Sequence, residues 1–135
     1  MSIQTKIAEF ETSFGIKLPL FYIDFINQHQ LEESRLFSDL TLIYGANDLA
    51  ERQNETQQYL KGYLKIGDDS GGYGVFICCR PYADDHIYIT GLGDLAETSL
   101  EILAQNFDAW TAKDYDTEVF CKPFTKIKWH RHFCN

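Results

Sequence analysis

The sequence predicts an α+β fold, a single domain in which a central, mostly antiparallel sheet is flanked by helices. The N-terminal region has apolar residues at helical spacing, whereas the middle third has three short β-rich runs separated by turns rich in Gly and Asp. Strands grouped between helical ends are typical of this class. With 135 residues, 44% of them hydrophobic, the chain has enough apolar surface for one core, so residues 1–135 are predicted to form one domain.

Two helices are predicted near the N-terminus. The apolar residues of the first follow Ser2 at spacings of four, three and four: Ile3, Ile7, Phe10 and Phe14. Gly15 supplies a left-handed C-cap, and Pro19 opens a second helix that runs to about Asn27. The two helices are expected to pack around one cluster: Phe10, Phe14, Leu18, Phe21 and Phe25.

The next segment is polar and irregular over residues 28–39, and an apolar, β-branched run predicts a short strand over 40–44. Asn47 or Asp48 then caps a weakly amphipathic helix that ends near Tyr59.

The β-rich runs of the middle third predict an antiparallel meander, with strands over 63–66, 75–79 and 86–90.

The C-terminal part is predicted to hold a long amphipathic helix and then a strand or tail. Ser99 caps the helix, which runs to about Lys113 and turns four apolar residues inward: Leu100, Leu103, Phe107 and Trp110. Alternating apolar and polar residues over 115–135 predict a basic terminal strand or tail.

The charge of the chain is strongly negative and unevenly distributed. The formal net charge is −8, but residues 1–118 hold eight basic and twenty acidic residues, a charge of −12, whereas the last seventeen residues carry +4. Such a body argues against a surface that neutralises phosphates, so no direct nucleic-acid partner is predicted. No apolar stretch is long enough for a membrane span, and the N-terminus lacks the apolar run of a signal peptide, so we expect no membrane partner and a cytoplasmic location. The asymmetry fits either a solvated tail near an acidic body or an acidic face that binds a partner.

The loop from Gly67 to Gly74 is the most distinctive local feature, and none of three chemical interpretations fits it. A phosphate-binding P-loop needs Lys and Ser or Thr after its last Gly, where this chain has Tyr73 and Gly74. A calcium loop that starts at Asp68 would need Glu where Cys79 stands. A nucleophile elbow would need Gly in place of Asp68. The sequence therefore predicts a Gly-rich turn whose aspartates accept hydrogen bonds from their own backbone.

Two further groups of residues suggest chemistry weakly. His130, His132 and Cys134 would share one face of a terminal strand and are the weak candidate for a zinc site. Cys78 or Cys79 with His86 would be needed for a thiol nucleophile and its base, but no third partner is indicated. We therefore predict no catalytic residues, no metal and no cofactor, and we keep a small zinc-binding or thiol enzyme as an alternative.

Several ordered motifs resemble the SUKH superfamily, which comprises bacterial immunity proteins and the domain of fungal cell-wall assembly regulators. The N-terminal residues that match its signature are Glu11, Phe14, Gly15, Leu18, Pro19, Tyr22, Phe25 and Ile26. The run from Leu64 to Gly72 is similar to the strand and Gly-rich turn of the family, with Gly67, Gly71 and Gly72 in place, and Ile87 and Tyr88 to a later strand. Residues 99–110 resemble its closing helix, with Asn106 in place of the usual Ser. The resemblance covers about residues 3–113 and leaves the basic tail out.

The resemblance implies an α+β fold and a protein that binds and neutralises a cognate secreted or contact-dependent toxin, such as a nuclease, by steric occlusion. A general regulatory or scaffold domain that binds proteins is the alternative within the same resemblance. The acidic body favours a partner with a basic surface. We expect contact residues where acid, aromatic and turn residues coincide: Asp68, Asp69, Tyr73, Asp84 and Asp85. Solubilising turns are the other interpretation of these residues.

Overall fold

The computed structural model describes residues 2–118 and has the predicted α+β architecture. Its helices are α1 (Ile3–Phe14), α2 (Leu20–Gln28), α3 (Leu49–Thr56), a short 3₁₀ helix η1 (Glu97–Ser99) and α4 (Phe107–Ala112). Its strands are β1 (Arg35–Leu36), β2 (Leu42–Ile43), β3 (Tyr63–Asp68), β4 (Tyr73–Cys78), β5 (Ile87–Gly91) and β6 (Glu101–Ala104).

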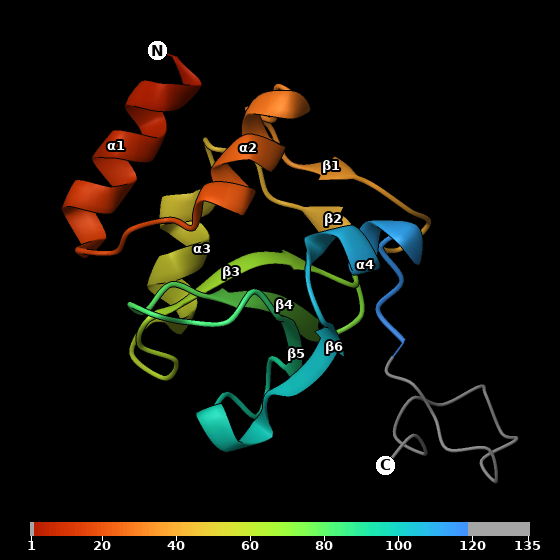
Figure 1. Ribbon diagram of the computed structural model, residues 1–135. Coiled ribbons are helices and arrows are strands. Elements are labelled where there is room, and N and C mark those ends of the chain that lie inside the picture. The colour runs from red at the N-terminus through yellow and green to blue at the C-terminus, as the bar shows by residue number, and fades with distance from the viewer. Residues whose placement is uncertain (1, 119–135) are drawn as a thin grey trace, which may run out of the picture.

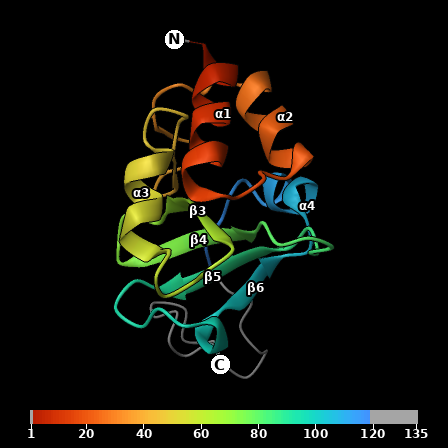
Figure 2. The ribbon, with the colours of Figure 1, turned by 90° about the vertical axis from the view of Figure 1, so that its left-hand side faces the viewer.

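Over the described residues the strands form a six-stranded meander in the order β1-β2-β3-β4-β5-β6, and each neighbouring pair is antiparallel. The predicted strands of the middle third are thus confirmed, and β1, β2 and β6 extend the sheet on both sides. Helices α1 and α2 lie together on one side of the sheet, α3 lies beside the β3 edge, and α4 lies next to β6 (Figures 1 and 2).

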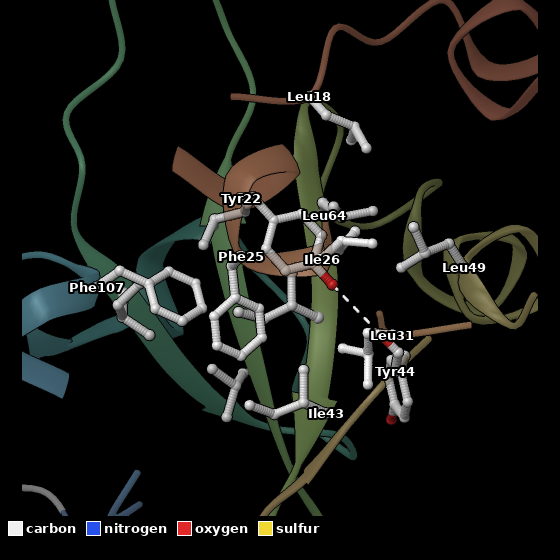
Figure 3. Packing of buried hydrophobic residues seen from close by; sticks show 14 of the residues in the cluster. Leu18, Tyr22, Phe25, Ile26, Leu31, Ile43, Tyr44, Leu49, Leu64 and Phe107 are labelled. Atoms are coloured by element: carbon white, nitrogen blue, oxygen red, sulfur yellow. Dashed lines mark hydrogen bonds between the residues drawn. The ribbon is translucent and has the colours of Figure 1, made fainter. Parts of the chain in front are cut away.

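The main core lies between the helices and one face of the sheet. Ile7 and Phe10 of α1 and Tyr22 and Ile26 of α2 are buried against alternate residues of the strands. Those strand residues are Leu64, Ile66, Val75, Ile77, Ile87 and Ile89, all fully buried. The side chains of α2, β2 and β3 pack together, and Phe107 of α4 lies against Tyr22 and Phe25 of α2 at one side of the core (Figure 3).

A smaller cluster covers the opposite face of the sheet. Leu60, Tyr63, Phe76 and Cys78 are buried there, and they contact Leu92, Leu95 and Leu100 from the segment before β6. The sheet is therefore buried on both faces, by helices on one and by loops on the other.

The predicted long helix from Ser99 to Lys113 is wrong. Ser99 ends η1, residues Glu101–Ala104 pair with β5 as strand β6, and α4 begins at Phe107. The cap is Asn106, whose side chain accepts a hydrogen bond of 2.8 Å from the backbone N of Ala109. The apolar spacings of three, four and three suit a helix. Residues 101–104 nevertheless form a strand because they pair with β5, which lies ten or more residues earlier in the sequence.

The connection between α1 and α2 is fixed by the residues that the sequence singled out. Gly15 caps α1 with φ of 65°, and the Glu11 carboxylate accepts a hydrogen bond of 2.9 Å from the backbone N of Leu18. Pro19 stands at the N-cap of α2, one position before the predicted first turn. Glu11 therefore satisfies a donor in the loop just before Pro19, which has no N–H of its own.

Helix α3 covers the part of β3 that β2 does not reach. Strand β2 pairs with β3 at Gly67 and Asp68, and the edge before these residues faces α3. Gln53 is fully buried, and its Nε2 donates a hydrogen bond of 2.9 Å to the carbonyl of Tyr63. The helix thus takes the place of a neighbouring strand at this edge.

Candidate partner-binding surface

The turn between β3 and β4 holds three of the predicted contact residues. Asp69 is 5% exposed, and its Oδ1 accepts hydrogen bonds from the backbone N of Gly71 at 2.8 Å and of Tyr73 at 3.0 Å. Asp68 Oδ1 accepts from the backbone N of Ser70 at 2.9 Å. The aspartates make the side-chain turns that the sequence predicts, and this leaves the Asp69 carboxylate little access to a partner.

The glycines of this turn are subject to different structural constraints. A Cβ at Gly67 would lie 2.3 Å from the Leu42 carbonyl oxygen, so β2 approaches β3 too closely for any side chain. Gly72 has φ of 104°, which strongly favours glycine. Gly71 has neither constraint, because an added Cβ would make an ordinary contact with Asp69 at 3.6 Å.

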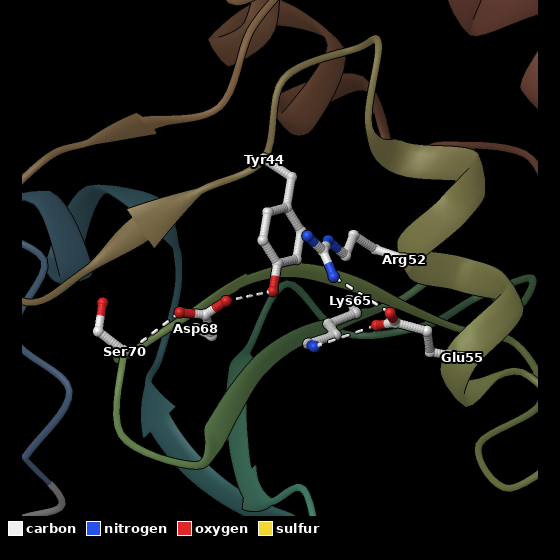
Figure 4. A network of polar contacts seen from close by, with 6 residues as sticks. All are labelled: Tyr44, Arg52, Glu55, Lys65, Asp68 and Ser70. Atoms are coloured by element: carbon white, nitrogen blue, oxygen red, sulfur yellow. Dashed lines mark hydrogen bonds and ion pairs between the residues drawn. The ribbon is translucent and has the colours of Figure 1, made fainter.

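A polar network beside this turn was not predicted from the sequence. The Tyr44 hydroxyl donates to Asp68 Oδ2, and Glu55 lies between the Arg52 guanidinium at 3.1 Å and the Lys65 ammonium at 3.7 Å (Figure 4). Burial lowers the pKa of Lys65, which is 4% exposed. Burial and the hydrogen bond to Asp68 raise the pKa of Tyr44. These groups hold each other in place, and the network ties α3 and β2 to β3.

The loop between β4 and β5 holds the other two predicted residues. Asp84 is exposed, and its two carboxylate oxygens accept from the backbone N of His86 at 3.0 Å and from the Tyr88 hydroxyl at 2.7 Å. Asp85 beside it is exposed. The two acidic turns lie at opposite ends of the six-residue strand β4, and at about 3.3 Å per residue this places them roughly 17 Å apart. The structure therefore does not bring the five predicted residues together.

Tyr82 is the most unusual residue of the β4–β5 loop. Its side chain is as exposed as in a free peptide, at 106%, and its φ is 62°. Positive φ is costly for a bulky residue, and nothing is gained by burial here. Gln30, Ser70, Asp114 and Tyr115 also have positive φ, and Tyr82 differs from them in its fully exposed aromatic ring.

Two hollows flank this loop and share the lining residues Cys79, Arg80 and Pro81. One, of about 430 Å³, lies between the loop and the start of α2, and Leu18, Pro19, Phe21 and Tyr82 contribute to its wall. The other, of about 570 Å³, lies between the loop, residues 14–16 and the end of α3. Leu20, which lies between the lining residues Pro19 and Phe21 in the sequence, is 71% exposed. We call this area, from Phe14 to Phe21 and from Cys79 to Asp85 with the end of α3, the loop surface.

Arg80 fixes the base of the loop. Its guanidinium forms a two-pronged ion pair with Glu97 at 2.9 and 3.0 Å, donates to the Lys61 carbonyl at 2.8 Å and lies 4.9 Å above the centre of the Tyr63 ring. The loop is thus anchored at Arg80 while Tyr82 stands in solvent.

The described residues give the thiol alternative little support. Cys78 and Cys79 are free thiols, and burial raises the pKa of Cys79 to about 12, which makes it a poor nucleophile. The His86 ring is hydrogen-bonded through Nδ1 with the Gln105 carbonyl at 2.9 Å.

Among residues 2–118, no group of three His, Cys, Asp or Glu side chains is arranged to hold a metal ion. His130, His132 and Cys134 lie outside the described residues, and so does most of the predicted terminal strand. Within the same part of the chain, no helix has the length and apolar character that crossing a membrane requires.

A meander sheet beneath two N-terminal helices, with a hollowed loop surface at one end, defines the α+β class that the sequence predicts. The family model described as SMI1 / KNR4 family (SUKH-1) matches residues 4–113, and the chain belongs to this family. No curated protein sequence matches the chain. The match ends before the basic tail, as the resemblance of the motifs also does.

Proposed function

We propose that this protein is an immunity protein that binds a cognate toxin and neutralises it by steric occlusion, and that the loop surface is where the toxin docks. Membership of the SUKH family supports the first part of the proposal. The second part rests on Tyr82, an exposed aromatic residue with a strained backbone at the rim of a hollow. Exposed aromatic anchors next to apolar hollows are common in protein interfaces.

The charges of the body support a basic partner. Residues 1–118 carry −12, and Asp84 and Asp85 place two acidic residues in the loop surface itself. A nuclease toxin needs a basic surface for its own substrate, so an acidic inhibitor would be attracted to it over long range. In this proposal Asp85 contacts the toxin directly, and the β3–β4 turn is a second contact point through Asp68 and Tyr73, with the buried Asp69 holding the shape of the turn.

Residues 1–135 are proposed to act as one cytoplasmic domain, without catalytic residues or a cofactor. A general protein-binding regulator would use the same surface, and the partner distinguishes the two. The neighbouring gene supplies that test: a toxin-domain gene beside this one, whose product arrests growth, is expected to be neutralised by co-expression of the chain.

The docking surface is tested by substitution, with toxin binding measured on the purified proteins. Tyr82→Asn is expected to weaken toxin binding at least tenfold, as loss of an interface anchor does, whereas Leu36→Asn, which changes an exposed apolar residue on β1, leaves binding unchanged. The association rate is expected to fall as salt is raised. Equal loss of binding in both variants would place the contact elsewhere, and a rate that does not respond to salt would refute the charge argument.

A further inference from the structure

Three buried polar atoms of α3 are left without hydrogen bonds, and one of them belongs to a residue that lines the loop surface. Among residues 2–118, the buried side-chain polar atoms that lack a partner are Arg52 Nε, Gln53 Oε1 and Thr56 Oγ1, and all three belong to α3. Native proteins pair most such atoms, because an unpaired buried acceptor is costly. Their concentration on one eight-residue helix therefore calls for a local explanation.

Gln53 belongs to the wall of the larger hollow of the loop surface. Its Nε2 is bound to the Tyr63 carbonyl, and because the two atoms of an amide diverge, Oε1 points away from that carbonyl. The hollow measures about 570 Å³, within the ~300–1,000 Å³ usual for pockets that hold a small ligand. A buried acceptor at the wall of a hollow of this size favours a ligand that brings a hydrogen-bond donor.

The other lining residues restrict what that ligand can be. Phe14, Ile16 and Pro81 make much of the wall apolar, and Lys61 and Arg80 contribute positive charge. No Asp or Glu lines this hollow, although the body as a whole is strongly acidic. A cationic side chain would find no counter-charge, and a carboxylate has no donor for Gln53 Oε1. A flat apolar ring with one neutral donor fits the apolar wall, the absence of acidic lining residues and the Gln53 acceptor.

We infer that this hollow binds an indole ring, and that in the complex the ring is a tryptophan side chain of the partner. Its N–H would donate to Gln53 Oε1, its ring would lie against Phe14 and Ile16, and the exposed Lys61 ammonium would lie over its face, which attracts cations more strongly than other aromatic rings. Gln58 and Lys61 are exposed lining residues, so their side chains rotate within nanoseconds and can move aside as the ring enters. The source of the ring rests on the proposed function, whereas the hollow itself does not.

The experiment uses the full-length chain labelled with ¹⁵N and two probes, indole and 1-methylindole, which differ in the N–H. Millimolar indole is expected to shift the backbone amide signals of Gly15, Ile16, Gly62 and Cys79. 1-Methylindole is expected to bind about tenfold more weakly, because the acceptor stays unpaired. Shifts at other residues, no shift at all, or equal affinity for the two probes would each overturn the inference.

Two matched variants separate the hollow from general surface binding. Gln58→Trp fills the hollow from an exposed position and should abolish indole binding, whereas Asn54→Trp, an exposed residue of α3 that does not line the hollow, should leave it unchanged. Gln53→Leu should make the affinities for the two probes equal; if that variant does not fold, the probe comparison in the natural chain still decides. A toxin that binds without competition from indole would overturn this inference and leave the proposed function intact. Indole binding as described, in a chain that neutralises no toxin, would support the indole site and overturn the proposed function.

Discussion

Replacing Tyr82 is expected to stabilise the fold while it weakens partner binding. Tyr82 has φ of 62° and a fully exposed side chain, so its substitution gives up no buried area. A left-handed backbone costs an ordinary residue about 1–2 kcal/mol, and Asn pays less of this because its short side chain suits that conformation. Tyr82→Asn should therefore raise the free energy of unfolding by about 0.5–1 kcal/mol, or the melting temperature by about 2–4 °C.

The measurement is urea unfolding followed by circular dichroism, with the slope of the transition unchanged. The matched control is Tyr59→Asn, the same substitution at a tyrosine that is 54% exposed and has no positive φ, and it should leave stability unchanged or lower it slightly. A stability gain at position 82 together with a loss of toxin binding would mark strain that the fold tolerates for function. An unchanged or lower stability of Tyr82→Asn would refute the reasoning, because the backbone would then carry no strain that Asn relieves.

Three other predictions concern the framework that holds the loop surface. Glu11→Ala should destabilise the fold by about 1–2 kcal/mol in urea unfolding, because the part-buried Leu18 N–H loses its acceptor. Glu11→Gln keeps an acceptor oxygen and should lose less than half as much stability. Equal losses in the two variants would exclude this hydrogen bond as the cause. Gly67→Ala should lower the free energy of unfolding by about 1–3 kcal/mol or more, because the added Cβ forces β2 away from β3. Gly71→Ala should leave it nearly unchanged. Similar losses in the two variants would contradict the close approach of Leu42 to Gly67. Burial raises the pKa of Tyr22, Tyr44 and Cys79 in the folded state, the last to about 12. The unfolded chain therefore loses these protons at lower pH than the folded chain, and the free energy of unfolding should fall as pH rises above about 9. A free energy of unfolding that stays constant up to about pH 11 would be the contrary result.

The N-terminal helices and the meander could be predicted because their signals are local. Apolar spacing, the left-handed Gly15 and the Gly and Asp turns each act within a few residues of the structure they specify. The segment after Ser99 could not be predicted in this way. Leu100 packs in the cluster on the loop-covered face, whereas Leu103 is buried in the main core, so the two apolar residues face opposite sides of the sheet. Pairing with β5 decides this, although Asn106, a cap residue within the supposed helix, was an available sign of the true start of α4.

The candidate site was less predictable than the fold, since the decisive features are not properties of residue type. The acidic turn and the backbone hydrogen bonds of Asp68 and Asp69 could be predicted, but the burial of Asp69 and the hydrogen bond from Tyr44 to Asp68 could not. The sign of φ at Tyr82 depends on how the β4–β5 loop closes, and the orphan oxygen of Gln53 depends on where the edge of β3 runs. Both need the three-dimensional structure, because each is set by an element distant in the sequence.

Two features of the loop surface cost the fold stability. Tyr82, with its positive φ, and Gln53, which holds one of the unpaired atoms of α3, line hollows that share Cys79, Arg80 and Pro81. At the other end of β4 the aspartates accept from backbone N–H groups, and the turn has positive φ at Ser70 and at Gly72. Positive φ thus occurs at both ends of β4, and the loop surface differs by its fully exposed Tyr82 ring and the unpaired Gln53 Oε1 beside a hollow. Because functional sites concentrate strain and unpaired groups, this combination, more than the acidic residues themselves, favours the loop surface as the main contact and the β3–β4 turn as the second.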